Sequence, residues 1–91
     1  MATQVIKKDG SKQPFDSEKI KRAINGAAKE AGLPDDRASQ IAEEVLSVIL
    51  EKTSAQEEIA TSGIKSIIVN ELDRVEPSVS AAWKAYEASK G

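Results

Sequence analysis

The sequence predicts an α+β fold that is mainly helical: a four-helix bundle capped by a small three-stranded sheet that starts with an N-terminal β-hairpin. Three observations predict it. An Asp-Gly pair separates two short extended segments near the N-terminus, apolar residues recur at helical spacing in four later segments, and glycines and prolines stand between those segments. The 91 residues suit one domain, which we assign to residues 1–91.

The hairpin is expected from two extended segments, residues 4–8 and 12–15. Asp9 and Gly10 lie between them, and glycine tolerates the positive φ of a tight turn. Pro14 cannot donate a hydrogen bond to a neighbouring strand, so it must lie at the end or the edge of the second strand.

The first helix is expected from about residue 17 to residue 31, with Asp16 as a plausible N-cap. Its apolar stripe contains four alanines among six residues, which lets neighbouring helices approach closely. The stripe comprises Ile20, Ala23, Ile24, Ala27, Ala28 and Ala31. Gly32, Leu33 and Pro34 form a typical helix end, with a glycine just beyond the helix and a proline after it.

Three further helices follow. The second is expected to be capped by Asp35 or Asp36 and to run through about residue 52. Thr61 or Ser62 would cap the third, and Pro77 suits the first turn of the fourth. The inward residues are Ala38, Ile41, Ala42, Val45, Val48 and Ile49 in the second helix, Ile64, Ile67, Ile68, Leu72 and Val75 in the third, and Val79, Ala82, Trp83 and Tyr86 in the fourth.

Two parts of this pattern are less regular. Residues 53–60 have no clear periodicity, and residues 58–60 could form a short third strand. Glu71 falls within the apolar stripe of the third helix, and we expect it to reach solvent near the end of the bundle.

The composition argues against catalysis. The chain has no cysteine, which excludes a disulfide framework, a thiolate zinc site and a cysteine nucleophile. It also has no histidine, the commonest general base and metal ligand. No apolar run approaches the roughly 18 residues of a membrane span, and the N-terminus lacks the pattern of an export signal. We therefore expect a cytoplasmic protein that is not an enzyme and does not bind membranes.

The charge is unevenly distributed along the chain. Residues 1–29 carry seven basic and three acidic residues, a net +4, whereas the remainder carries six basic and twelve acidic residues, a net −6. This asymmetry is either chance variation of the solvated surface or the mark of an anion site at one end of the fold. Nucleic acid is not the expected ligand, because the basic excess is small and only three aromatic residues are available for stacking.

Any phosphate binding must rely on side chains, because the chain has no glycine-rich phosphate loop. Lys7 and Lys8 are adjacent on the expected first strand, so they would point to opposite faces. A hairpin packed over the start of the first helix could bring Lys19 close to one of them. Two such ammonium groups repel each other by about 4 kcal/mol at a separation of ~4 Å in an effective dielectric of ~20, and a bound polyphosphate would remove that repulsion. Each lysine taken alone is better explained as an ordinary solvated surface residue, and only the arrangement of the lysines as a set makes an anion site as good an explanation.

Three blocks of the sequence resemble the ATP-cone domain. Residues 5–20, with the following Arg22, Ala23, Ile24 and Ala27, are similar to the family pattern V-x-K-R-D-G-S followed by P-F-D-x-x-K-I-x-x-A-I. Residues 59–65, followed by Ile68 and Leu72, resemble its later I-x-[ST]-x-x-I segment. Residues 77–86 resemble its terminal P-x-V-A-x-A-Y-x-x-Y-R pattern. The first block is the most specific, and together the blocks span essentially the whole chain.

The resemblance implies a regulatory module that binds ATP or dATP, with or without Mg²⁺, on a four-helix bundle capped by a three-stranded sheet. Such modules occur in ribonucleotide reductases, in a repressor of reductase genes and in some kinases. By position, Lys7, Lys8 and Lys19 look like phosphate ligands, and Lys65 could also reach the nucleotide. The residues that would line or support the base pocket are Val5, Phe15, Ile20 and Ile64.

Some roles stay open at this point. Asp16 could accept a hydrogen bond from the adenine amino group or act only as an N-cap, and Thr61 is either an N-cap or a contact to phosphate or base. Phe15, Ile24, Trp83 and Tyr86 suit the core better than a ligand contact.

Two positions depart from the family pattern. Lys8 replaces an arginine, which loses bidentate phosphate binding, and Glu87 replaces the terminal arginine, which reverses the charge. We therefore expect a nucleotide sensor that acts on its own oligomeric state or on a protein partner such as a ribonucleotide reductase, as a free-standing chain or an excised domain. The alternative is an interaction or oligomerisation module that has lost nucleotide binding. A phosphotransferase comes third, because no catalytic loop or base is recognised.

Overall fold

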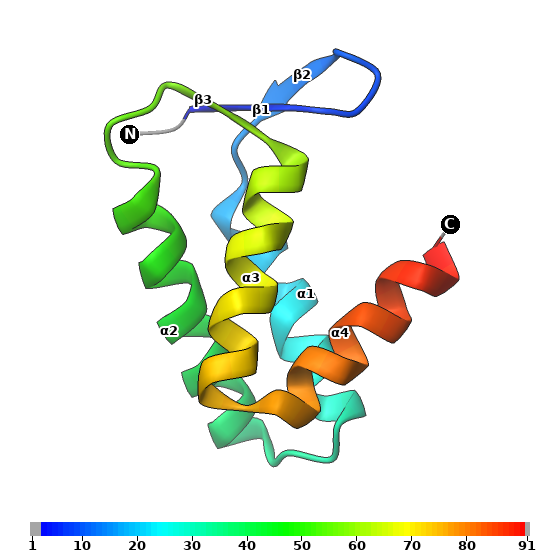
Figure 1. Cartoon of the computed structure of the whole chain (residues 1–91). Coiled ribbons are helices and arrows are strands. Elements are labelled where there is room, and N and C mark those ends of the chain that lie inside the picture. The colour runs from blue at the N-terminus through cyan, green and yellow to red at the C-terminus, as the bar shows by residue number, and fades with distance from the viewer. Residues whose placement is uncertain (1–2, 91) are drawn as a thin grey trace.

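The computed structural model describes residues 3–90, which form a four-helix bundle with a three-stranded sheet across one end (Figure 1). This confirms the expected fold class. In chain order the elements are β1 (Gln4–Ile6), β2 (Lys12–Pro14), α1 (Ser17–Glu30), α2 (Asp35–Lys52), β3 (Glu58–Ala60), α3 (Thr61–Val75) and α4 (Pro77–Lys90).

The sheet has the strand order β2-β1-β3, so the first strand is the central one. β1 is antiparallel to β2 and places Val5 opposite Gln13. β1 is parallel to β3 and places Val5 opposite Ile59. A parallel pair needs a long crossover connection, which α1 and α2 provide. The uncertain third strand is thus confirmed, and it joins the hairpin to the N-terminal end of α3.

The hairpin turn is longer than expected. Lys7 N donates to the Ser11 carbonyl at 2.8 Å, Gly10 N donates to the Lys7 carbonyl at 2.9 Å, and Gly10 has φ +90°. Asp9 Oδ1 accepts from Ser11 N at 2.9 Å and from Ser11 Oγ at 2.7 Å, and these bonds hold the pKa of Asp9 below its usual range. Because β1 ends at Ile6 and both lysines follow it, the prediction that Lys7 and Lys8 share a strand is wrong.

Local signals fix both ends of α1. Asp16 is the N-cap, and its Oδ1 accepts from Lys19 N at 3.1 Å. At the other end Gly32 has φ +92°, and Leu33 N donates back to the Ala28 carbonyl at 3.1 Å. The cap and the glycine-terminated end are therefore confirmed.

The expected caps of α2 and α3 are wrong. The N-caps are Pro34 and Ala60, and neither has a side-chain capping bond. Asp35 is already the first helical residue of α2, because the extended Pro34 leads directly into the helix. Thr61 is likewise the first residue of α3, because β3 continues into that helix without a loop.

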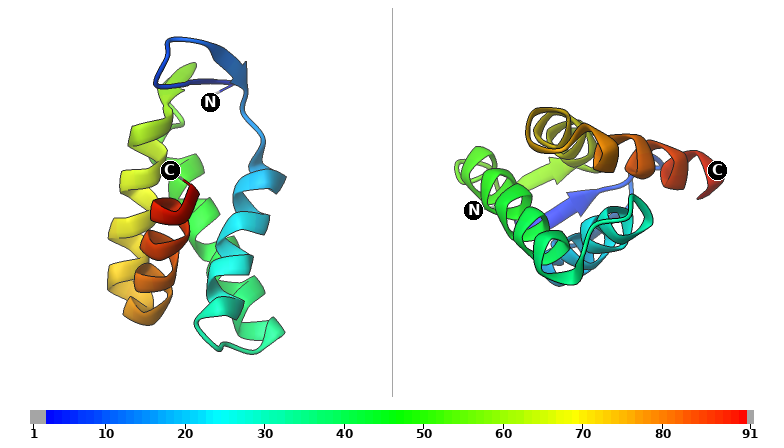
Figure 2. Two further views of the ribbon diagram at one scale, coloured as in Figure 1. Left: turned by 90° about the vertical axis from the view of Figure 1, so that its right-hand side faces the viewer. Right: turned by 90° about the horizontal axis from the view of Figure 1, so that it is seen from below.

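The four helices form a ring in which α1 and α3 each pack against both α2 and α4 (Figure 2). Small residues are buried in both α1 and α2, which pack against each other: Ala28, Ala38 and Ala42 are fully buried. The largest fully buried apolar side chains are Ile24, Ile41, Ile49, Ile68, Leu72, Val45 and Val79. The helical periodicity therefore predicted most of the core, although Val48, Val75 and Ala82 are only partly buried.

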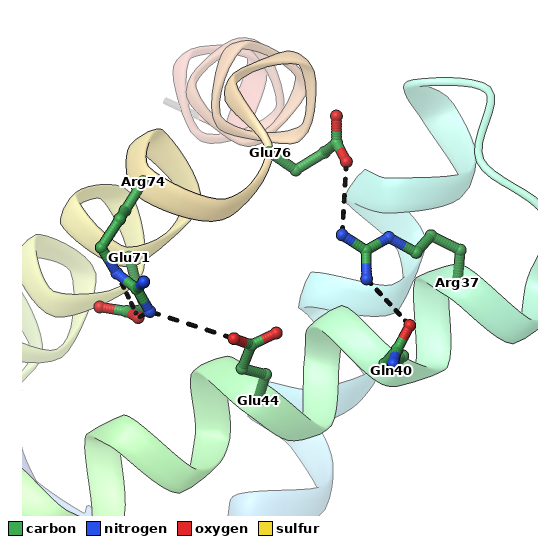
Figure 3. Close-up of polar contacts among 6 residues, drawn as sticks. All are labelled: Arg37, Gln40, Glu44, Glu71, Arg74 and Glu76. Atoms are coloured by element: carbon green, nitrogen blue, oxygen red, sulfur yellow. Dashed lines mark hydrogen bonds and ion pairs between the residues drawn. The ribbon is translucent and has the colours of Figure 1, made fainter.

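Ion pairs tie α2 to the C-terminal end of α3, away from the sheet (Figure 3). Arg74 pairs with Glu71 and lies 4.0 Å from Glu44, and the bond to Glu71 raises the pKa of Arg74. Arg37 reaches Glu76 at 3.6 Å. The expectation that Glu71 reaches solvent is wrong: its side chain is only 12% exposed, and Arg74, in the same helix, pairs with its carboxylate.

Candidate functional site

A cleft of about 450 Å³ opens between the sheet and the helices, a volume typical of small-molecule sites. Five elements build it: β1, β2, the N-terminal turns of α1 and α3, and α4. The lining residues are Val5, Lys7, Gln13, Pro14, Asp16, Lys19, Ile20, Ala23, Thr61, Ile64, Lys65, Ile68, Trp83 and Glu87.

The cleft gathers most of the site residues expected from the sequence. Eight of the ten line it: Val5, Lys7, Asp16, Lys19, Ile20, Thr61, Ile64 and Lys65. Lys8 instead lines a neighbouring hollow. Phe15 lines neither, and its half-buried side chain packs against the hydrophobic core. Phe15 can therefore support the site without touching a ligand.

The lining combines an apolar surface with positive charge. Ile20, Ile64 and Ile68 contribute aliphatic side chains from two facing helices. Three lysines also line it: Lys7 from the connection between β1 and β2, Lys19 from α1 and Lys65 from α3. Such a cleft suits a ligand with a flat apolar part and an anionic part.

The neighbouring hollow is lined by Ile6, Lys7, Lys8, Ala60, Thr61, Ser62 and Lys65. It shares Lys7, Thr61 and Lys65 with the cleft, so the two spaces adjoin. It lies at the N-terminus of α3, which has no side-chain cap and no acidic residue in its first turn. A helix N-terminus with lysines around it favours anions.

Thr61 and Asp16 also hold the fold together around the cleft. Thr61 Oγ1 donates to the carbonyl of Ile6 at 3.2 Å, which ties the start of α3 to β1. Asp16 caps α1 through Oδ1. A carboxylate has two oxygens, so the capping bond of Asp16 does not exclude a second bond from a ligand.

Sequence reasoning missed six lining residues: Gln13, Pro14, Ala23, Ile68, Trp83 and Glu87. Trp83 and Glu87 are four residues apart, a spacing that places both on one face of α4. Trp83 is buried as expected, and its Nε1 has no hydrogen-bond partner among the described residues. Tyr86 is 43% exposed, so its expected place in the core is wrong; its ring instead lies tilted against Trp83, with centroids 6.4 Å apart.

Glu87 brings negative charge into the cleft. Its Oε2 lies 3.0 Å from Lys65 Nζ, and its side chain is 25% exposed, compared with 49% for Lys65. This ion pair links α3 to α4 across the cleft. Within residues 3–90 no cluster of three or more acidic side chains could hold a metal ion, and no helix there is long and apolar enough to cross a membrane.

The model of the ATP cone domain matches residues 3–90. This chain belongs to the ATP-cone family. ATP-cone domains bind ATP or dATP as allosteric effectors and are regulatory rather than catalytic. The fold is therefore that of a domain family that is regulatory and related to ribonucleotide reductases.

Two curated relatives support the same assignment. The chain is 38% identical over 73 residues to an anaerobic ribonucleoside-triphosphate reductase of Salmonella typhimurium, and 35% identical over 72 residues to one of Escherichia coli. Each match covers 79% of this ATP-cone chain and 10% of the relative. The chain thus spans about a tenth of the length of these enzymes.

Proposed function

We propose that this ATP-cone chain binds ATP or dATP in the cleft and acts as a regulatory domain without catalytic activity of its own. The observation that carries the proposal is the convergence of Lys7, Lys19 and Lys65 around one apolar cleft. Surface lysines scatter when they serve only solubility, whereas these three come from the hairpin connection, α1 and α3 and line the same space.

The lining suggests how a nucleotide would lie. The adenine ring would pack against the aliphatic side chains of α1 and α3, where Asp16 could accept a hydrogen bond from the amino group. The phosphates would lie toward Lys7, Lys19 and Lys65, and could extend over the N-terminus of α3 toward Lys8 in the adjoining hollow. Any Mg²⁺ would then enter the cleft bound to the phosphates of the nucleotide.

The proposed output is a change in assembly. Nucleotide binding would alter either the self-association of the chain or its contact with a protein partner. Because the relatives are anaerobic ribonucleoside-triphosphate reductases, a ribonucleotide reductase is the partner that we propose. The cytoplasmic location expected from the sequence belongs to the same proposal.

Glu87 favours a second candidate function. A carboxylate in the cleft, paired with Lys65, reduces the positive charge available to phosphates. A scaffold that had lost nucleotide binding could tolerate such a residue. The alternative is therefore an interaction or oligomerisation module on the ATP-cone fold.

Calorimetric titration of the chain with ATP, dATP, GTP and AMP tests the proposal. We expect saturable binding of the adenine nucleotides and weaker binding of GTP, because the amino group that Asp16 would recognise is replaced by a carbonyl in guanine. Absence of binding at millimolar ATP with Mg²⁺ would contradict the proposal. Self-association in sedimentation without any response to nucleotide would then support the alternative.

A further inference from the structure

Glu87 is the feature of the cleft that nucleotide binding alone does not explain. Its side chain lines the same space as the three lysines and is three-quarters buried. It is held 3.0 Å from Lys65. A carboxylate at such a place repels any anion that approaches Lys65.

The net charge of the cleft lining shows how far the acidic residues offset the lysines. Its ionisable side chains are Lys7, Lys19 and Lys65 on one side, and Asp16 and Glu87 on the other, a sum of +1. Asp16 is engaged in capping α1, close to where the base would lie. Glu87 instead contacts one of the lysines that would meet phosphate. Glu87 therefore opposes phosphate charge directly.

We propose that Glu87 is a specificity-determining residue that lowers the discrimination between nucleotides by phosphate charge. The proposal rests on the proposed function. A phosphate group competes with the Glu87 carboxylate for the Lys65 ammonium, so Lys65 adds little to the affinity for each further phosphate. Compared with a site that has the same lysines but no Glu87, this site therefore draws less of its affinity from the phosphates and more from the nucleoside.

Affinity measurements on a ligand series test this proposal. Adenosine, AMP, ADP and ATP are titrated at fixed ionic strength into the unaltered chain, Glu87→Gln and Glu43→Gln. Glu43 is the matched control, because it also pairs with a lysine, Lys21 at 3.3 Å, but lies outside the cleft. We expect Glu87→Gln to raise the affinity for ATP about tenfold, with progressively smaller gains for ADP and AMP and under about twofold for adenosine. Glu43→Gln should leave the affinities for all four ligands unchanged.

A double-mutant cycle isolates the Lys65 contribution. Lys65→Ala should weaken ATP binding little in the unaltered chain and about tenfold in Glu87→Gln, where Lys65 is released to the phosphates. Circular dichroism and thermal unfolding check that each variant is folded, and Glu87→Ala serves as a second variant if Glu87→Gln is not.

The outcomes separate the two proposals. If neither the unaltered chain nor Glu87→Gln binds ATP, the proposed function itself fails. If the unaltered chain binds ATP, the inference is overturned by equal gains for adenosine and ATP, by no gain, or by a loss of affinity in Glu87→Gln.

Discussion

Replacing Lys7 or Lys19 by alanine is expected to weaken ATP binding about ten- to hundredfold. Both line the cleft, and each would donate a charge-assisted hydrogen bond to phosphate, an interaction of about 1.5–3 kcal/mol, where ~1.4 kcal/mol corresponds to a tenfold change in affinity. Both residues are exposed, so their removal should leave the midpoint of thermal unfolding nearly unchanged. Calorimetric titration with ATP measures the affinity, and a thermal scan measures the stability.

Matched lysines outside the cleft provide the controls. Lys12, in the same hairpin as Lys7, pairs with Glu58 at 2.6 Å. Lys29, in the same helix as Lys19, pairs with Asp35 at 3.3 Å. Lys12→Ala and Lys29→Ala remove the same charge but should weaken ATP binding less than about threefold, since long-range effects of exposed charges are screened by salt. Equal losses in all four variants would show that net charge, rather than the cleft, accounts for binding.

Leu72→Ala is expected to lower the free energy of unfolding by about 2–5 kcal/mol. Leu72 is fully buried in α3 and does not line the cleft. Its truncation leaves a cavity among helices that can relax only partly. A domain of this size has a total stability of about 5–15 kcal/mol, and each kcal/mol shifts the unfolding midpoint by roughly 4–8 °C. Urea and thermal unfolding should both detect the loss.

Ser66 provides the comparison for Leu72 because it is an exposed residue of the same helix. Ser66→Ala should change the stability by less than about 0.5 kcal/mol. A loss below about 1 kcal/mol in Leu72→Ala would contradict the packing described for α3. Below its unfolding transition, Leu72→Ala should still bind ATP as the unaltered chain does.

The fold could be predicted from the sequence wherever the signal is local. Gly32 and Leu33 end α1 as expected, because the positive φ and the backward hydrogen bond depend on neighbouring residues only. The N-caps of α2 and α3 could not be predicted, since they depend on the residue at which each helix begins after Pro34 and after β3. The burial of Glu71 could not be predicted, because it depends on how α3 packs in the bundle; only its pairing with Arg74, three residues further along the same helix, is local.

The residues of the candidate site could likewise be predicted only where the signal is local in the sequence. The lysines of the hairpin and α1 were found through a sequence pattern that spans one short stretch of chain. Trp83 and Glu87 were missed as lining residues, because only the packing of α4 against α1 and α3 brings them to the cleft. The reversed charge at Glu87 was visible in the sequence, but its contact with Lys65 was not.

Titration of the isotope-labelled chain with ATP, followed by nuclear magnetic resonance, tests most directly whether the cleft is a nucleotide site. Trp83 is the single tryptophan, so its indole N–H gives one unambiguous signal from the cleft wall. We predict that this signal and the amides of Lys7, Lys19 and Thr61 shift together and saturate, while the amides around Arg74, at the far end of the bundle, stay in place. Unchanged cleft signals at saturating ATP, or shifts confined to the far end, would contradict the assignment of this cleft as the nucleotide site.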